Sequence, residues 1–398
     1  MIRLRYSTML MLTIIVGLLI AYVSLEFAYP DFLKKPTLLD FNAFYLVSEM
    51  SLEGNLALAY DQDAFLARQV DLPGFSGVTL LWSYPPPFNI VIMPLAVVPP
   101  WAAYGVFITL TGVMFLYILR RLSGEAFHTV LVLFLPLILI IIRSGQNSFL
   151  IGSLLGLACI LGLRKRSLAG LPLGLLVIKP HLAVGYGIWV FLDRRWSTAL
   201  VSILTLISVS VFAAALFGPE VWTAALDSIS RTGSSLTQGG FDMFRMTSIY
   251  AFLTSIGTGS SAAMAIHAIS VMIALCALLL LGWAGISARS FMGAGVFFSA
   301  IVSPYSYDYD LVILAVAACL MIGDIILRST SLEKAFLLAG SWVVSGYGLL
   351  MSLIFKSADL ADKGNQISIA GPILLMMGAL IARILLRDSL EVISGSAK

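Results

Sequence analysis

Long runs of apolar residues, separated by short polar connections, occupy most of this chain. Hydrophobic residues make up 60% of its 398 residues and charged residues 11%, whereas a soluble domain carries roughly 25% charged residues. So few charges cannot form a polar surface around one soluble core. Helices satisfy their own backbone hydrogen bonds inside a bilayer, so we predict an all-α, polytopic membrane protein.

The apolar runs predict about twelve transmembrane helices within a single membrane domain, residues 1–398, although several runs are shorter than the roughly 20 residues of a full crossing. The first run, residues 8–25, is followed by no signal-peptide cleavage pattern and is expected to remain as a helix. Pro99–Pro100 is expected to break the second run, and residues 247–286 to hold a re-entrant piece besides a crossing. The later runs are 88–119, 127–142, 148–163, 168–178, 182–192, 197–217, 247–286, 290–302, 309–327, 336–355 and 367–386.

The charges sort by side when twelve crossings are threaded through a bilayer. The loops on the side of the N-terminus hold 15 of the 24 Lys and Arg residues and 6 of the 21 Asp and Glu residues, which leaves 9 and 15 for the other side. Basic residues favour the cytoplasmic side. We therefore predict a multi-pass protein with both termini inside. As its location we expect the bacterial inner membrane.

This topology places several polar motifs together on the outer side, which suggests one site there. The longest polar region is the first outer loop, residues 28–87, where near-helical spacing predicts amphipathic helices. The outer motifs are "LLDFNAFY", "WSYPPPF", "RSGQNSF", "IKPH", "FDMFRM" and "PYSYDYD".

Asp40 is the carboxylate of greatest interest, because it lies next to the bilayer among aromatic residues that include Tyr45. A carboxylate there costs desolvation unless it has a partner or a role. One interpretation is a helix-capping residue whose oxygens accept backbone N–H groups. The alternative is a functional carboxylate at the membrane surface.

Lys179 is the most notable basic residue, because it lies between two short apolar runs in "VIKPHLAV", beside His181. Its side chain either reaches the lipid headgroups or binds a phosphate. Arg143 and Arg245 are further candidates for the same anion.

The remaining candidates are polar or aromatic residues in the other outer motifs. Tyr84, in the proline-rich "WSYPPPF", belongs either to an interfacial aromatic belt or to a rigid wall beside a pocket. Gln146 and Asn147 lie in a turn that is otherwise explained by solvation. Asp308 and Asp310 fit helix caps, and for Asp310 the alternative is a position facing an internal cavity.

No metal or nucleotide chemistry is indicated by the motifs. Three cysteines lie within apolar runs at no ligand spacing, and three histidines are too few for a His-rich metal site. The phosphate-binding, dinucleotide-binding and hydrolase signatures are missing from the sequence.

The motifs in combination resemble those of glycosyltransferase family 87, which comprises polyprenyl-phosphate-mannose-dependent α-1,2-mannosyltransferases and their relatives. The resemblance runs from about residue 38 to about residue 320. The motifs that carry it, in order, are "DFNAFY", "YPPPF" before "PLAVVPPWAAY", "GQNSFLIGSLLG", "AGLPLGLLVIKPHLAV", "RMTSIYAFL" and "SPYSYDYDLVIL".

The resemblance implies a GT-C fold with its active site facing outward. It also implies an inverting transfer of a hexose, most often mannose, from a polyprenyl-phosphate-sugar donor to a glycolipid or glycan acceptor. Asp40 matches the proposed general base. Lys179, Arg143, Arg245 and His181 would stabilise the leaving phosphate, so we expect no obligatory metal or other cofactor.

A transporter or flippase of lipid-linked sugars is the main alternative from another functional class. It would account for the many helices and the intramembrane charges. Its polar residues would be expected near the bilayer midplane and from two internal repeats, whereas the polar motifs here cluster on one side and no repeat is evident. A polymerase or ligase of lipid-linked glycans would share the geometry of the transferase and differ in substrate.

Overall fold

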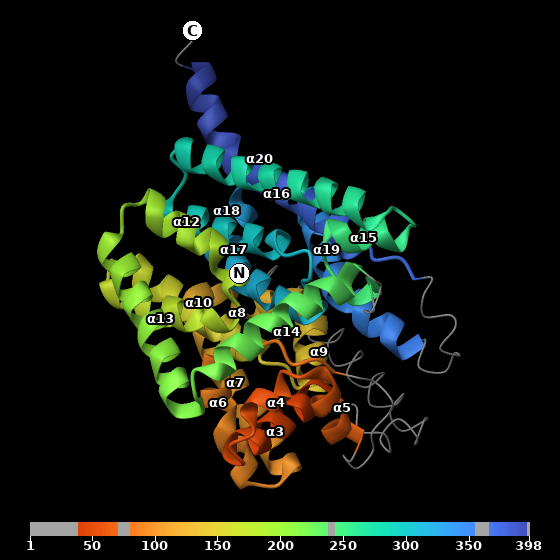
Figure 1. The fold of residues 1–398 in the computed structure, drawn as a ribbon. Helices are drawn as coiled ribbons and strands as arrows, with labels where there is room; N and C mark the ends of the chain where they lie inside the picture. Colours follow the sequence, from red (N-terminus) through yellow and green to blue (C-terminus); the bar gives the residue numbers. More distant parts are fainter. Residues whose placement is uncertain (1–38, 71–79, 238–242, 355–365, 396–398) are drawn as a thin grey trace.

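The computed structural model describes residues 39–70, 80–237, 243–354 and 366–395 (Figure 1). All regular elements in these ranges are helical. Six helices are long and apolar enough to cross a membrane, and six shorter apolar helices accompany them. The predicted all-α polytopic architecture is confirmed, while the predicted crossing at residues 8–25 lies outside the described ranges.

Most of the described helices follow one another after short connections. The α-helices are α3 (Leu39–Leu52), α4 (Leu56–Ala59), α5 (Gln62–Val70), α6 (Pro86–Ile92), α7 (Pro100–Ser123), α8 (Phe127–Leu133), α9 (Leu135–Ser144), α10 (Ser148–Leu163), α11 (Gly170–Leu175), α12 (Val184–Leu192), α13 (Trp196–Phe217), α14 (Glu220–Thr237), α15 (Ile249–Ser255), α16 (Ser260–Trp283), α17 (Ala288–Val302), α18 (Val312–Arg328), α19 (Ser331–Ile354) and α20 (Ala370–Gly395). The 3₁₀ turns are η1 (Met93–Val97), η2 (Gly124–Ala126), η3 (Ser167–Ala169), η4 (Leu176–Ile178), η5 (Pro180–Ala183), η6 (Met243–Arg245) and η7 (Asp308–Leu311).

Helices α17 and α18 form the centre of the molecule. In Figure 1 they lie between α12 on one side and α16 and α20 on the other, and all of these helices contact α17. Every residue of α17 from Ser290 to Ile301 is buried. A helix that is apolar on all sides is stable only when other helices surround it, so this pair forms the core of the bundle.

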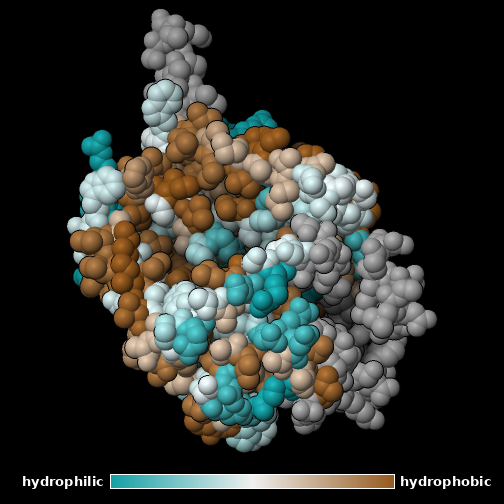
Figure 2. Space-filling view, viewed as in Figure 1, coloured by the Kyte–Doolittle hydropathy of each residue, from teal (hydrophilic) through white to brown (hydrophobic). Residues whose placement is uncertain are grey.

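The surface divides into an apolar and a polar region. Hydrophobic side chains cover the outer helices α12, α13 and α16, whereas hydrophilic ones gather over α14 and the region of α3–α5 (Figure 2). Only 6% of the apolar stretch of α13 is buried inside the protein, against 67% for the stretch Asp308–Arg328. The apolar region is therefore suited to contact with lipid.

The breaks in the apolar runs lie close to where the sequence predicts them. Pro99–Pro100 separates η1 from α7, and residues 247–286 divide into the short α15 and the long α16. Residues 39–70 form α3, α4 and α5, in the region where the sequence predicts amphipathic helices. Helix α5 is amphipathic, but α3 buries residues on nearly all sides, because α6, α7 and η1 pack around it.

Two glycines allow α12 and α17 to touch along their backbones. A Cβ atom at Gly185 would lie 1.8 Å from the carbonyl oxygen of Gly295. The Gly185 N–H also donates to Ser299 Oγ at 2.8 Å. Small residues at such crossings bring membrane helices into direct contact. This contact fixes α12, and with it the turn at residues 179–183 that precedes the helix.

We expect Gly185→Ala to lower the free energy of unfolding by about 3 kcal/mol, the upper part of the range for overpacked cores. The added methyl group must push α12 away from α17. Gly187→Ala on the same helix is the matched control, because its Cβ would meet nothing within 4 Å. Unfolding in detergent measures both variants, and equal stabilities would contradict the proposed helix contact.

Candidate functional site

Two distant segments are joined where the polar motifs meet. Met246 and Tyr307 form an isolated antiparallel bridge. The Thr247 N–H donates to the Ser306 carbonyl at 2.7 Å, and Ser248 Oγ donates to the Pro304 carbonyl at 2.7 Å. These bonds hold the end of η6 against the segment that leads into η7. They bring Arg245 and Asp308 together.

Arg245 and Asp308 form a two-pronged ion pair. Arg245 donates from Nη2 to Asp308 Oδ1 at 3.0 Å and from Nε to Oδ2 at 3.2 Å. The Tyr309 N–H also donates to Oδ1 at 2.9 Å. Burial alone would lower the pKa of Arg245, but the Asp308 carboxylate outweighs this and raises it. The guanidinium is therefore held as a fixed positive charge.

Lys179 and Asp310 form a second buried ion pair. Lys179 Nζ lies 2.6 Å from Asp310 Oδ1, and the two residues are 8% and 5% exposed. Asp310 Oδ2 accepts the Tyr307 N–H at 3.1 Å. Lys179 lies at the break between η4 and η5, where the following proline disfavours helical backbone. Burial alone would lower the pKa of Lys179, but Asp310 more than offsets this and raises it.

Tyrosine rings connect the two ion pairs. The Lys179 ammonium lies 4.9 Å from the centre of the Tyr309 ring and 5.5 Å from that of Tyr84. The Arg245 guanidinium lies 5.7 Å from the Tyr309 ring and 5.5 Å from the Tyr307 ring. An aromatic face attracts a cation. Tyr309 thus contacts both cations.

Asp40 faces this cluster from the first turn of α3. Burial raises the pKa of Asp40 above its ordinary value, although the charges of Arg245 and Lys179 and a hydrogen bond from Gln146 act to lower it. Gln146 Oε1 accepts the Asn147 N–H and the Tyr84 hydroxyl, each at 3.1 Å. This leaves the Gln146 amide group as the donor to the carboxylate. Asp40 therefore lies within the field of both cations.

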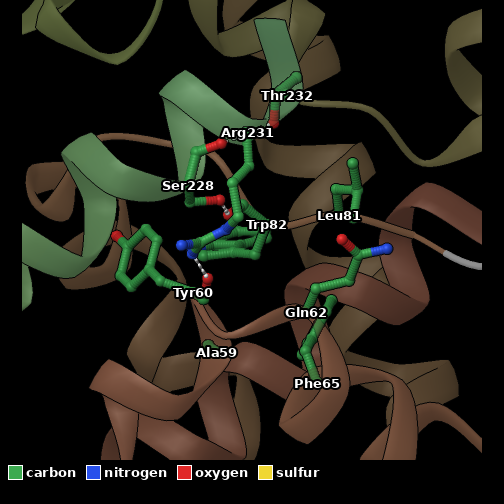
Figure 3. Close-up of a pocket in the computed structure, with 9 residues that line it drawn as sticks. All are labelled: Ala59, Tyr60, Gln62, Phe65, Leu81, Trp82, Ser228, Arg231 and Thr232. Carbon is green, nitrogen blue, oxygen red and sulfur yellow. Dashed lines mark hydrogen bonds between the residues drawn. The ribbon is translucent and has the colours of Figure 1, made fainter. Parts of the chain in front are cut away.

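An aromatic wall supports the site on the side of Tyr84. The Phe44 ring lies 5.9, 5.7 and 5.2 Å from those of Trp82, Tyr84 and Phe88, always edge to face. Trp82 and Phe88 are fully buried in this wall, so these two rings contact protein on all sides. Helix α14, to which no sequence motif points, holds Trp82 of this wall in place. Ser228 Oγ donates to the Trp82 carbonyl at 2.6 Å (Figure 3).

A small pocket borders Trp82 of this wall, between α14 and residues 59–65 and 81–82 (Figure 3). Arg231 reaches across it and donates from Nη2 to the Tyr60 carbonyl at 2.7 Å (Figure 3). The pocket has a volume of about 10 Å³, which is close to the space of one water molecule. It is a polar seam that attaches α14 to these residues.

The other predicted site residues take different positions. Asn147 is fully buried, and its side-chain amide makes no hydrogen bond within the part of the chain that the structure describes. His181 lies near Lys179 and Asp310. Arg143 is in the last turn of α9, which packs against η7. Tyr45 points elsewhere, because its hydroxyl donates to the Val98 carbonyl at 3.1 Å.

The structure places Asp308 and Asp310 in ion pairs. Each is buried and paired with a basic residue. Asp310 also completes a capping box with Tyr307 at the start of η7, so the helix-cap interpretation holds for this residue. Within the described ranges, no group of three or more His, Cys, Asp or Glu side chains is placed to hold a metal ion.

Tyr307 and Tyr309 are site residues that the sequence analysis quoted without assigning a role. Their rings stack with centres 5.5 Å apart and planes 6° from parallel. The signal that would have found them is the alternation in "YSYDYD", where each tyrosine of the pair neighbours a paired aspartate. Aromatic faces beside carboxylates are suited to hold basic side chains.

We expect Lys179→Met to lower the free energy of unfolding by about 3–5 kcal/mol, because it leaves the Asp310 carboxylate buried without its partner. Adding Asp310→Asn should restore part of this loss. The control is Arg68→Met, which breaks an ion pair of 2.7 Å whose side chains are 42% and 43% exposed. Exposed pairs contribute about 1 kcal/mol or less. Similar losses in both single variants would contradict a buried Lys179 pair.

Comparison of the sequence with known proteins identifies its family. A family model described as glycosyltransferase family 87 matches residues 82–304, more than half of the chain. No curated protein and no solved structure matches the chain. The matched segment includes Tyr84, Gln146, Lys179 and Arg245. The matching family is the one that the sequence motifs resemble. The chain belongs to glycosyltransferase family 87 and is a glycosyltransferase.

Proposed function

We propose that this glycosyltransferase moves a hexose from a polyprenyl-phosphate sugar to a hydroxyl group of a glycolipid or glycan. Mannose is the hexose that we favour. The observation that carries the proposal is a carboxylate, Asp40, that faces two fixed cations next to apolar helices. A lipid-phosphate donor has an anionic group at the membrane surface and a chain in the bilayer. Such a donor needs a site of this kind.

In this mechanism Asp40 is the general base. It removes the proton of the acceptor hydroxyl while that oxygen forms a bond to the anomeric carbon. The bond between this carbon and the phosphate oxygen breaks, and its electron pair leaves with the phosphate. Attack from the face opposite the phosphate inverts the anomeric centre. A raised pKa makes Asp40 a stronger base than an exposed aspartate.

Lys179 and Arg245 stabilise the negative charge that develops on the phosphate. Each has donors left after its ion pair, because Lys179 has three N–H groups and Arg245 has five. Arg143 and His181 contribute to the same anion site. Tyr84, Gln146 and Asn147 contact the sugar of the donor in this proposal. The enzyme spans the bacterial inner membrane with both termini inside and this site facing outward.

We expect Asp40→Asn to lower the rate of transfer by about 10²–10⁴-fold, the usual contribution of a general base. Because burial raises the pKa of Asp40 in the folded protein, the folded state binds the proton more tightly than the unfolded chain. The charged form therefore costs stability at neutral pH, and the Asn variant should be at least as stable as the wild type.

The assay follows radiolabel from polyprenyl-phosphate mannose into glycolipid with purified protein in detergent, and with glucose, galactose and arabinose donors in parallel. Asp63→Asn is the matched control, since Asp63 is an exposed carboxylate in the same loop. A fully active Asp40→Asn enzyme would exclude Asp40 as the base. If the wild type transferred no label from any of these donors, the result would contradict the proposed reaction.

The pH profile tests the same carboxylate independently. Asp40 acts only when deprotonated, so kcat/KM should fall as the pH drops through its folded-state pKa, above the ordinary 3.8. Gln146→Ala removes a hydrogen bond that lowers this pKa. The acid limb of kcat/KM should then move to higher pH. An unchanged limb in Gln146→Ala would show that another group controls it.

A further inference from the structure

Helix α19 packs behind both halves of the Arg245–Asp308 ion pair. It contacts η6, which carries Arg245, and η7, which begins with Asp308. The face of α19 toward these turns carries small residues at helical spacing, namely Ser341, Ser345 and Gly348, all of them buried. Small residues let a helix approach its neighbour closely.

Gly348 is the residue of this face that meets the carboxylate. A Cβ atom at this position would lie 2.1 Å from Asp308 Oδ2 and 3.1 Å from Asp308 Cγ. Oδ2 is the oxygen that accepts from Arg245 Nε. Because Oδ1 is held by Arg245 Nη2 and by the Tyr309 N–H, the carboxyl group cannot turn aside without losing these bonds.

We propose that Gly348 is a positioning residue, whose lack of a side chain leaves the room in which Asp308 orients Arg245 toward the donor phosphate. The part that concerns the donor rests on the proposed function; the part that concerns Asp308 does not. Any side chain at residue 348 displaces the carboxylate, and Arg245 moves with it. The N–H groups of the Arg245 guanidinium are then no longer directed at the donor phosphate.

The first test is a double-mutant cycle on stability in detergent, which needs no activity. Gly348→Ala should lower the unfolding temperature in the wild-type background. It should have little effect when Asp308→Ala is already present, because the clashing oxygens are gone. Gly323→Ala, whose Cβ would meet nothing within 4 Å, is the control. Equal effects of Gly348→Ala in both backgrounds would overturn the proposal.

The second test measures transfer from the labelled polyprenyl-phosphate sugar. Gly348→Ala should lower kcat/KM for the donor by about 10–100-fold, because a displacement of about 1 Å can cost about 10²-fold. The KM for the acceptor should change little. An unchanged donor kcat/KM, with the stability coupling present, would overturn the role in donor binding. Stability coupling without transfer by the wild type would support the positioning of Asp308 and contradict the proposed function instead.

Discussion

Five charged groups gathered in one part of an apolar bundle are the constraint on which the rest of the structure depends. Two are cations and three are carboxylates, and each cation has its own carboxylate within hydrogen-bonding distance. An isolated charge in such surroundings costs several kcal/mol, and removing one member of a pair is strongly destabilising. The fold therefore has to bring both pairs together before either can be buried.

Irregular backbone places four of these five groups, whereas Asp40 lies in the first turn of helix α3. Lys179 lies where two 3₁₀ turns meet, Arg245 ends η6, and both aspartates belong to η7. Inside a membrane protein, non-helical backbone is tolerated where it is buried in protein or lines a cavity. Around these turns the core pair α17 and α18, the wall at Tyr84 and helix α14 supply a rigid frame. The regular helices thus serve mainly as scaffold, and the interruptions hold both ion pairs.

The sequence is sufficient to predict the helical membrane fold, the main breaks and most of the charged residues of the site. Polar groups in apolar surroundings stand out because of their cost, and Asp40, Lys179 and Arg245 are found in this way. The pairing is different, since Lys179 and Asp310 are 131 positions apart and no local pattern connects them. The burial of α3 and the direction of Tyr45 also depend on neighbours distant in sequence. Gly348 leaves space for Asp308 because it has no side chain. The hydrophobic periodicity of the sequence does not reveal such a role.

The order of the partners along the chain has a consequence for biosynthesis. In both ion pairs the basic residue precedes the acidic one, by 131 and by 63 positions. A chain made from its N-terminus therefore presents Lys179 and Arg245 to the membrane before Asp308 and Asp310 exist. Until residues 308–310, about three-quarters of the way along the 398-residue chain, have been synthesised, neither cation has its paired carboxylate. The site can close only late in assembly, because a chain that stops short of residue 308 lacks the partner carboxylate of each cation.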